Sequence, residues 1–216
     1  MEAENGSHLP DVYNISWVTP KTLCDDDISI SASTISKSPT DPTDRVKILY
    51  QYDKDSQKRD FVITVPRDPA AFITCRGVAK DMFTRGDTKI ETNRYGAQFV
   101  LDGNNKYHIE LYAAFAQVIA KIKDITGTDV TFPIKDMEGY SILYTNLIHA
   151  NDGRMFSSAY TADEQLDILN VRKCKSRPAF LLSMIKKSSK ETKIRVQLSQ
   201  IYVHEEIKNF PLANRD

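Results

Sequence analysis

The stretch Lys193-Ile194-Arg195-Val196-Gln197-Leu198-Ser199-Gln200-Ile201-Tyr202-Val203, near the end of the chain, decides the class of fold. Its apolar residues alternate with polar ones through Ile194, Val196 and Leu198, and the alternation resumes at Ile201 and Val203 after a shift. Successive side chains of a strand point to opposite faces of a sheet, so this period of two predicts a long strand with one buried face. The chain is therefore expected to be built around a sheet.

Upstream of this stretch, similar runs bounded by turn residues predict further strands. The segments are Val12–Val18, Val46–Tyr52, Arg59–Val65, Ala97–Leu101, Tyr140–Ile148, Arg154–Tyr160, Leu166–Arg172 and Ala179–Ile185. The turn residues Asp53–Ser56 join the second and third of these into a hairpin. Residues Ala70–Asp81 fit neither the strand nor the helix period, and Arg85-Gly86-Asp87 predicts an exposed turn.

One segment, from about Tyr107 to Ile125, has the helical period instead. Its apolar residues recur at steps of three and four, and Gly127 suits the C-terminal stop of a helix. The apolar stripe has to pack on another element, and the sheet is the simplest partner. The expected fold is mainly β, of the α+β kind, with one long amphipathic helix.

Composition divides the chain of 216 residues into three parts. Residues 1–44 form an acidic N-terminal section with one strand and a loop rich in Ser, Thr and Pro, which is expected to be mobile because such a sequence buries little apolar surface. Residues 45–203 form the core domain, and residues 204–216 form a short C-terminal tail. No window approaches 18 consecutive apolar residues, and the N-terminus lacks the features of a secretory signal, so an intracellular protein with no membrane partner is expected.

The usual signatures of catalysis and cofactor binding are missing from the sequence, including the phosphate-binding and dinucleotide-binding glycine loops. His108-Ile109-Glu110 matches part of the zinc deaminase motif, but the Pro-Cys-x-x-Cys that completes that zinc site is absent. Cys24, Cys75 and Cys174 are too far apart for a metal knuckle and are expected to be reduced. We therefore expect no enzyme, no cofactor and no bound metal.

The charge of the chain sums to zero, since 29 Lys and Arg balance 29 Asp and Glu, and this excludes a uniformly basic coat for nucleic acid. The distribution is uneven, however. Residues Val171–Arg195 hold nine basic residues and one acid, Glu191, whereas the first 44 residues have a net charge of −6. A basic segment of this kind suits a phosphate backbone, because each neutralised phosphate releases counterions. The basic residues are Arg172, Lys173, Lys175, Arg177, Lys186, Lys187, Lys190, Lys193 and Arg195.

Aromatic residues lie close to basic ones elsewhere in the sequence. Stacking of an unpaired base on an exposed aromatic ring contributes about 1–3 kcal/mol and tolerates any sequence, so such pairs suit a single strand. Aromatic residues at alternate strand positions are also common as core residues or cross-strand pairs. The further candidates for nucleic-acid binding are Tyr50, Tyr52, Arg59, Arg76, Phe83, Arg85, Tyr95, Tyr107, Arg154, Phe156 and Tyr160.

The order of these features resembles the single-stranded-DNA-binding proteins of large eukaryotic DNA viruses. The resemblance covers about residues 46–203 and follows the order of the elements rather than an invariant motif. The segments that carry it are Phe61–Pro66, Arg76-Gly77-Val78, Tyr95–Leu101, Ile109–Ile125, Tyr140–Tyr160, Ser176–Leu182 and Lys193–Val203.

The resemblance implies an OB-like barrel of five strands, with additional strands and the helix packed on it. It also implies binding of single-stranded DNA during replication, in the cytoplasm or nucleus of an infected cell, with replication proteins as partners. Many such proteins end in an acidic tail, whereas this chain carries its excess of acids at the N-terminus. Recruitment of partners through a tail is therefore in doubt.

We expect a non-enzymatic protein that binds single-stranded DNA with little sequence preference, and that acts in DNA replication, recombination or repair. A virion structural protein with a β-sandwich fold remains an alternative, for which the basic segment would contact a partner or the genome. RNA binding is a second alternative, because contacts to the 2′-hydroxyl cannot be seen in a sequence. A homo-oligomer is an open option.

Overall fold

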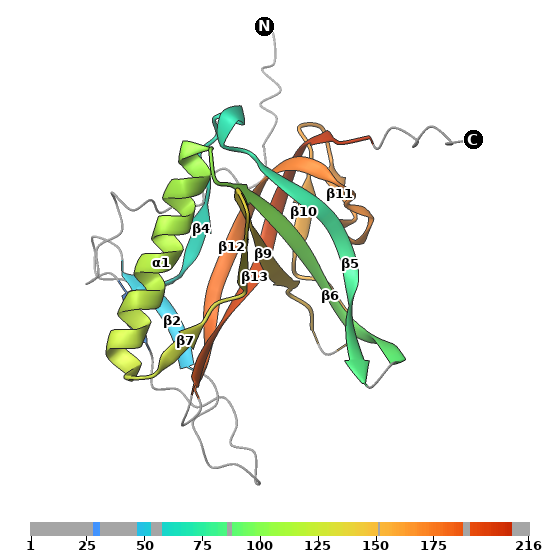
Figure 1. Cartoon of the computed structure of the whole chain (residues 1–216). Coiled ribbons are helices and arrows are strands. Elements are labelled where there is room, and N and C mark those ends of the chain that lie inside the picture. Colours follow the sequence, from blue (N-terminus) through green and yellow to red (C-terminus); the bar gives the residue numbers. More distant parts are fainter. Residues whose placement is uncertain are drawn as a thin grey trace, which may run out of the picture.

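A computed structural model describes residues 28–30, 47–52, 58–85, 88–150, 152–187 and 191–208 (Figure 1). The side chains of 28–30, 47–52, 58–60, 82–91, 93 and 183–187 lie outside this description. The predicted strand Val12–Val18, the predicted mobile loop and Cys24 also lie outside the described residues.

The described residues are mostly in strands. The strands are β1 (Ile28–Ile30), β2 (Lys47–Tyr52), β3 (Lys58–Asp60), β4 (Val62–Thr64), β5 (Ile73–Arg85), β6 (Thr88–Asp102), β7 (Asp129–Thr131), β8 (Ile134–Met137), β9 (Tyr140–Leu147), β10 (Ser158–Tyr160), β11 (Gln165–Leu166), β12 (Cys174–Lys187) and β13 (Glu191–Glu206). The helices are the α-helix α1 (Lys106–Thr126) and the short 3-10 helices η3 (Pro69–Ala71) and η4 (Ile168–Asn170). None of these helices has the length and hydropathy needed to cross a bilayer.

Five strands close into a barrel. The neighbours around it are β5, β6, β9, β13, β12 and β5 again, and every pair is antiparallel except the parallel pair β9–β13. In chain order the ring therefore runs first, second, third, fifth, fourth and back to first. This is the order of a Greek-key barrel of the OB type. The predicted fold class, an OB-like barrel with extra strands and one helix, is confirmed.

The closure of the barrel between β12 and β5 is short. It consists of three residue pairs, Cys174↔Cys75, Lys175↔Thr74 and Ser176↔Ile73. Beyond them the same edge of β12 pairs with β4 and then with β2, so the extra strands extend the sheet past the barrel. Both cysteines at the closure are free and buried.

Helix α1 covers one side of the barrel (Figure 1). It begins after Asn105, whose side chain accepts a hydrogen bond from the backbone N–H of Tyr107, and it ends at Gly127, which has a φ of 65°. The helical period places Leu111, Phe115, Val118 and Ile122 on the buried face, where they join the core. The predicted helix is confirmed to within one residue at each end.

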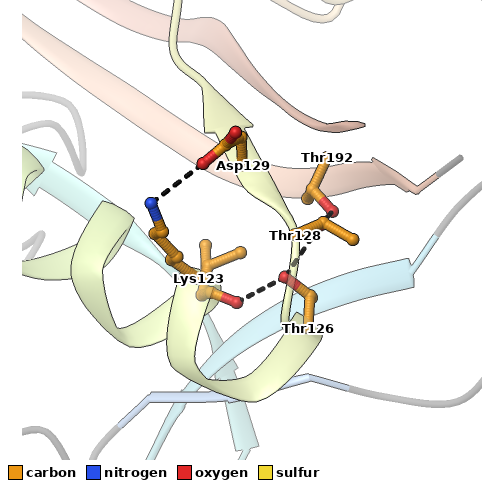
Figure 2. Close-up of polar contacts among 6 residues, drawn as sticks. Lys123, Thr126, Thr128, Asp129 and Thr192 are labelled. Atoms are coloured by element: carbon orange, nitrogen blue, oxygen red, sulfur yellow. Dashed lines mark hydrogen bonds and ion pairs between the residues drawn. The ribbon is translucent and has the colours of Figure 1, made fainter. Parts of the chain in front are cut away.

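The C-terminal end of α1 is fastened to the sheet by polar contacts (Figure 2). The Thr126 hydroxyl donates to the Ile122 carbonyl at 2.7 Å and lies 3.2 Å from the Thr128 hydroxyl, which in turn lies 2.5 Å from that of Thr192 on β13. Lys123 pairs with Asp129 of β7 at 2.9 Å. These contacts join three elements and fix the direction in which the chain leaves the helix.

Three predicted strands differ from the observed ones. Residues Leu166–Arg172 are mostly not a strand, because Asp167 caps the 3-10 helix η4 by accepting from the N–H of Leu169. Of Arg154–Tyr160 only β10 is a strand, which pairs in parallel with β13 and antiparallel with β11. The segment Arg59–Val65 divides, since β3 pairs with β2 as predicted while β4 pairs with β12.

Candidate nucleic-acid interface

A groove lies on the outer face of β5, β6 and β9. The register of β6 and β9 places Phe99 opposite Leu143, and both are buried in the core. The next pair, Gln98 and Tyr144, therefore points outward, because side chains alternate along a strand. Tyr144 is 40% exposed, which is high for a tyrosine in the middle of a strand.

The groove has a volume of about 740 Å³, within the range of about 300–1,000 Å³ that is typical of ligand sites. Its lining residues come from β5, β6 and β9, together with Pro133. They are Arg76, Gly77, Ala79, Lys80, Asp81, Gly96, Ala97, Gln98, Pro133, Tyr144, Thr145 and Asn146. In an OB fold the same face, over the second and third barrel strands, is the one that binds oligonucleotides.

A smaller hollow of about 170 Å³ continues from the groove toward β13. The two share Asn146, which lies opposite Gly96 on β6 and opposite Gln197 on β13. The smaller hollow is lined by Arg94, Tyr95, Asn146, Leu147, His149, Arg195 and Gln197. Together the two hollows form a path across four neighbouring strands, β5, β6, β9 and β13.

Four exposed cations lie along this path. Arg76 and Lys80 line the larger groove, and Arg94 and Arg195 line the smaller hollow. The register of β5 against β6 shifts between Cys75 and Val78 and again between Lys80 and Met82. Such irregularities bend a strand and change the direction of its side chains. Arg76 and Lys80, on either side of Val78, both line the groove.

At Gly77 the first irregularity depends on glycine. Its φ of 102° is one that other residues rarely adopt, and an added Cβ would lie 3.3 Å from the carbonyl oxygen of Val171. The backbone of Arg172 lies just beyond, about as close to that position. The beginning of the basic segment therefore crosses β5 at the end of the groove beside Arg76.

Two hairpins extend from the barrel, one made by β5 and β6 and the other by β12 and β13 (Figure 1). They diverge in the lower part of the picture, with β9 between their bases. In OB folds these two connections flank the binding face. The register of the second hairpin places Lys186 opposite Lys193.

Of the predicted site residues, Arg76, Tyr95 and Arg195 line this path. Arg172 and Lys173 are exposed at the start of β12, near the end of the groove at Gly77. The structure thus brings together residues that are far apart in the sequence: Arg195 from the basic segment, and Arg76 and Tyr95 from the further candidates.

Arg177 is placed in the interior. It is 2% exposed, and its Nε donates to the carbonyl oxygen of Val65 at 2.7 Å. An enclosed guanidinium cannot lie against a phosphate backbone that passes outside the barrel, so Arg177 is not part of the interface proposed below. Its position follows from the coverage of β12 on both faces at this point, where residues 176–180 are all buried.

Several other predicted residues lie elsewhere on the surface with partners of their own. The Tyr107 hydroxyl donates to Asp68 at 2.5 Å, and this hydrogen bond is the largest cause of the raised pKa of Tyr107. Arg154 pairs with Asp152 at 2.8 Å, and Lys193 pairs with Glu191 at 3.2 Å. None of these three residues lines the path described above, nor do Lys175, Phe156 and Tyr160.

The remaining predicted residues lie outside the described side chains. They are Tyr50, Tyr52, Arg59, Phe83, Arg85, Lys186, Lys187 and Lys190. The backbone places Phe83 and Arg85 on the β5–β6 hairpin and Lys186 and Lys187 on the β12–β13 hairpin. Their part in binding stays a prediction.

The sequence-based prediction omitted Tyr144, Gln98 and Asn146. Tyr144 and Asn146 share the phase of β9 opposite to that of Leu143 and Leu147, but this phase also contains the buried Ile142. The sequence pattern alone therefore does not mark Tyr144 as exposed. The involvement of Gln98 depends on the pairing of β6 with β9, which the sequence does not specify.

Metal ligation has no site in the described part of the chain, where no three His, Cys, Asp or Glu side chains gather closely enough to hold an ion. The Asp25-Asp26-Asp27 run lies outside that part. The polar and aromatic groups that line the path are amides, guanidinium and ammonium groups, one imidazole, one carboxylate and tyrosine rings.

No protein-family model and no curated protein sequence matches the chain. Among solved structures it is similar to the single-stranded DNA-binding protein from bacteriophage Enc34, with a TM-score of 0.46 and 11% identity over 78% of this chain and 90% of that chain. For the same phage protein in complex with single-stranded DNA, the TM-score is 0.44 and the identity 10%, over 76% and 93% of the two chains. For gp2.5, a single-stranded DNA binding protein encoded by bacteriophage T7, the values are 0.44 and 9%, over 72% and 92%.

Proposed function

We propose that this protein binds single-stranded DNA along the path over β5, β6, β9 and β13, without requiring a fixed sequence motif. The observation that carries the proposal is the groove over the second and third strands of an OB-type barrel, lined by exposed cations and an exposed tyrosine. The proposal is for a binding protein, not an enzyme.

The arrangement suits a single strand in two ways. Arg76, Lys80, Arg94 and Arg195 are spread along the path, so that successive phosphates can each meet a positive charge. Tyr144 offers a ring on which an unpaired base can stack, which a base inside a duplex cannot do. The basic residues Lys186, Lys187 and Lys190 would add further positive charge for the strand to neutralise.

The biological setting rests on the sequence resemblance named above. On that basis we infer a role in replication, recombination or repair of a viral genome, at replication sites in the cytoplasm or nucleus of the host, with replication proteins as partners. RNA is the alternative ligand, and a structural role in the virion is the alternative function. Both are outcomes of the following test.

The test is titration of a labelled single strand of about 30 nucleotides, of the matching duplex and of the matching RNA, each at two salt concentrations. We expect the single DNA strand to bind at least about tenfold more tightly than the duplex, with an affinity that falls steeply with salt. Tighter binding of the RNA than of the single DNA strand would mean that RNA is the ligand. Absence of binding to all three would overturn the proposal and favour the structural role.

A further inference from the structure

The groove contains one acid, Asp81 on β5, among the cations that line it. A carboxylate repels phosphate and so lowers the affinity of the groove for a polyanion. Its presence is explained if it contacts another part of the nucleic acid. The bases are the part that can make such a contact, because each carries N–H donors on its Watson–Crick edge.

The position of the carboxylate is specified by its neighbours. Its Oδ2 accepts a hydrogen bond from the Nδ2 of Asn146 on β9 at 3.2 Å. Its Oδ1 lies over Gly96 on β6, where an added Cβ would come within 2.9 Å of it and within 2.7 Å of the Thr145 carbonyl oxygen. The glycine thus leaves the space that the carboxylate fills, and Asp81 spans from β5 across β6 to β9.

This carboxylate lies beside the exposed tyrosine. Tyr144 and Asn146 are two residues apart on β9 and point to the same face, so the Asp81–Asn146 pair is the next polar feature along the groove from the tyrosine ring. Asn146 donates one of its two amide N–H groups to Asp81 and keeps its amide oxygen, so the pair presents mainly acceptors: the carboxylate oxygens and the amide oxygen.

We propose that Asp81 and Asn146 form a base-reading subsite that takes the Watson–Crick edge of a guanine stacked on Tyr144. Guanine has two adjacent donors on this edge, N1–H and the 2-amino group, which match the two oxygens of a carboxylate. Thymine has a single N–H between two carbonyl oxygens, which a carboxylate repels. Adenine and cytosine each have one amino group beside an acceptor nitrogen. The subsite therefore favours guanine and disfavours thymine.

This inference rests on the proposed function, and the test separates the two. The probes are single strands of about 30 nucleotides in which thymine alternates with guanine, with inosine or with cytosine, and an all-thymine strand, in a lithium buffer that does not support guanine quadruplexes. Inosine keeps the purine ring and N1–H but lacks the 2-amino group, so it keeps most of the stacking and removes one of the two hydrogen bonds. We expect the guanine strand to bind at least about fivefold more tightly than the inosine strand.

The variant that tests the carboxylate is Asp81→Asn, which keeps the size of the side chain and removes its charge. We expect it to bind the guanine and inosine strands within about twofold of each other, and to bind the all-thymine strand about twofold more tightly than the natural protein, because a negative charge leaves the groove. Asp124→Asn makes the same change in net charge on the exposed surface of α1 and should keep the preference for guanine.

Each outcome has one meaning. Equal binding of all strands by the natural protein, or a preference for thymine, overturns the subsite and leaves the proposed function intact. An unchanged guanine-to-inosine ratio in a folded Asp81→Asn protein also overturns it. If no strand binds, the proposed function itself is wrong and the subsite falls with it.

Discussion

The two sides of the barrel are built from the same strands but differ in what their exposed faces do. On one side α1 covers the core, and Phe115 packs against Phe132 and Phe180 with ring centroids 5.0 and 6.2 Å apart. On the other side the outer face of β6 and β9 carries Gln98, Tyr144 and Asn146 and is left uncovered by any described element. No residue of α1 is among those that line the groove.

The difference shows how the fold separates stability from binding. Alternation along β6 sends Phe99 into the core and Gln98 into the groove, so neighbouring residues of one strand serve different purposes. Changes on the helix side are therefore expected to alter the free energy of unfolding, and changes in the groove the affinity for a single strand. Each of the following predictions tests one side of this separation.

The largest effect is expected on the helix side, for Phe115→Ala. Phe115 is 1% exposed and contacts aromatic rings from two other parts of the chain, so its removal leaves a cavity in the middle of the core. We expect a loss of about 3–5 kcal/mol in the free energy of unfolding, measured by urea denaturation. The affinity of the protein that remains folded for a single strand should be unchanged.

The control for this variant is Ile109→Ala, on the same helix but 51% exposed, which should cost less than about 1 kcal/mol. A loss as large as that of Phe115→Ala would mean that the exposed face of the helix also carries much of the stability. Weakened DNA binding by a folded Phe115→Ala protein would mean that the helix side also contributes to the affinity.

The next effect is expected on the groove side, when Arg76, Lys80, Arg94 and Arg195 are all changed to Gln. Because these four side chains are exposed, stability should change little, whereas affinity for a single strand should fall roughly 30- to 100-fold at low salt. The slope of log affinity against log salt should become shallower by about 3, at about 0.7 for each phosphate that the variant no longer neutralises. Fluorescence anisotropy at several salt concentrations measures both.

A matched comparison is the change to Gln of Lys186 and Lys187, which lie on the β12–β13 hairpin, and of Lys190. If the groove is the main path of the strand, this triple change should cost less affinity and less salt slope than the quadruple one. A larger loss for the hairpin variant would place the main phosphate contacts on the basic segment instead, as its charge alone predicts. A loss for neither would contradict the proposed function.

The sequence predicted the elements whose signal is local and missed those that depend on pairing. Period and caps were sufficient for α1, and alternation for β13, because each is a property of one segment. The division of Arg59–Val65 between β2 and β12 is a matter of long-range pairing, which no local pattern encodes. The binding path was predicted only in part for the same reason. Arg76 and Arg195 are 119 positions apart in the chain and reach one path through the pairing of β5, β6, β9 and β13.

The prediction from charge clustering was also wrong for one residue, which it placed on the binding surface. Arg177 belongs to the basic segment by position, but Ser176, Arg177 and Pro178 lie where β12 is covered on both sides, so burial overrides the tendency of arginine to be exposed. Its neighbours Arg172 and Lys173 precede this point and are exposed. The number of basic residues in a segment does not show which of them are exposed, because the buried Arg177 and the exposed Arg172 count equally.

The smallest effect concerns pH and returns to the helix side. His108, in the first turns of α1, is 3% exposed, its Nδ1 accepts from the backbone N–H of Asp102 at 3.0 Å, and its Nε2 donates to the carbonyl oxygen of Ala71 at 3.3 Å. Only the neutral ring can accept at Nδ1. Burial, as the largest cause, lowers the pKa of His108, and the charge of Lys175 adds to it against the opposing hydrogen bonds to Ala71 and Phe72 and the charge of Asp102.

Because the pKa is lower in the folded than in the unfolded protein, the unfolded state takes up the proton first as the pH falls. The stability from neutral His108 is therefore complete above the unfolded pKa of about 6.5 and is lost as the pH falls below it. His108→Gln keeps an acceptor and a donor without titrating, so between about pH 7.5 and 5.5 its urea midpoint should fall less than that of the natural protein. His8, His149 and His204 remain in both proteins, so the difference between the two curves isolates His108. If the urea midpoints of the two proteins fell equally with pH, protonation of the His108 ring in the folded protein would cost no stability. The helix side would then tolerate a charge, as the groove side does.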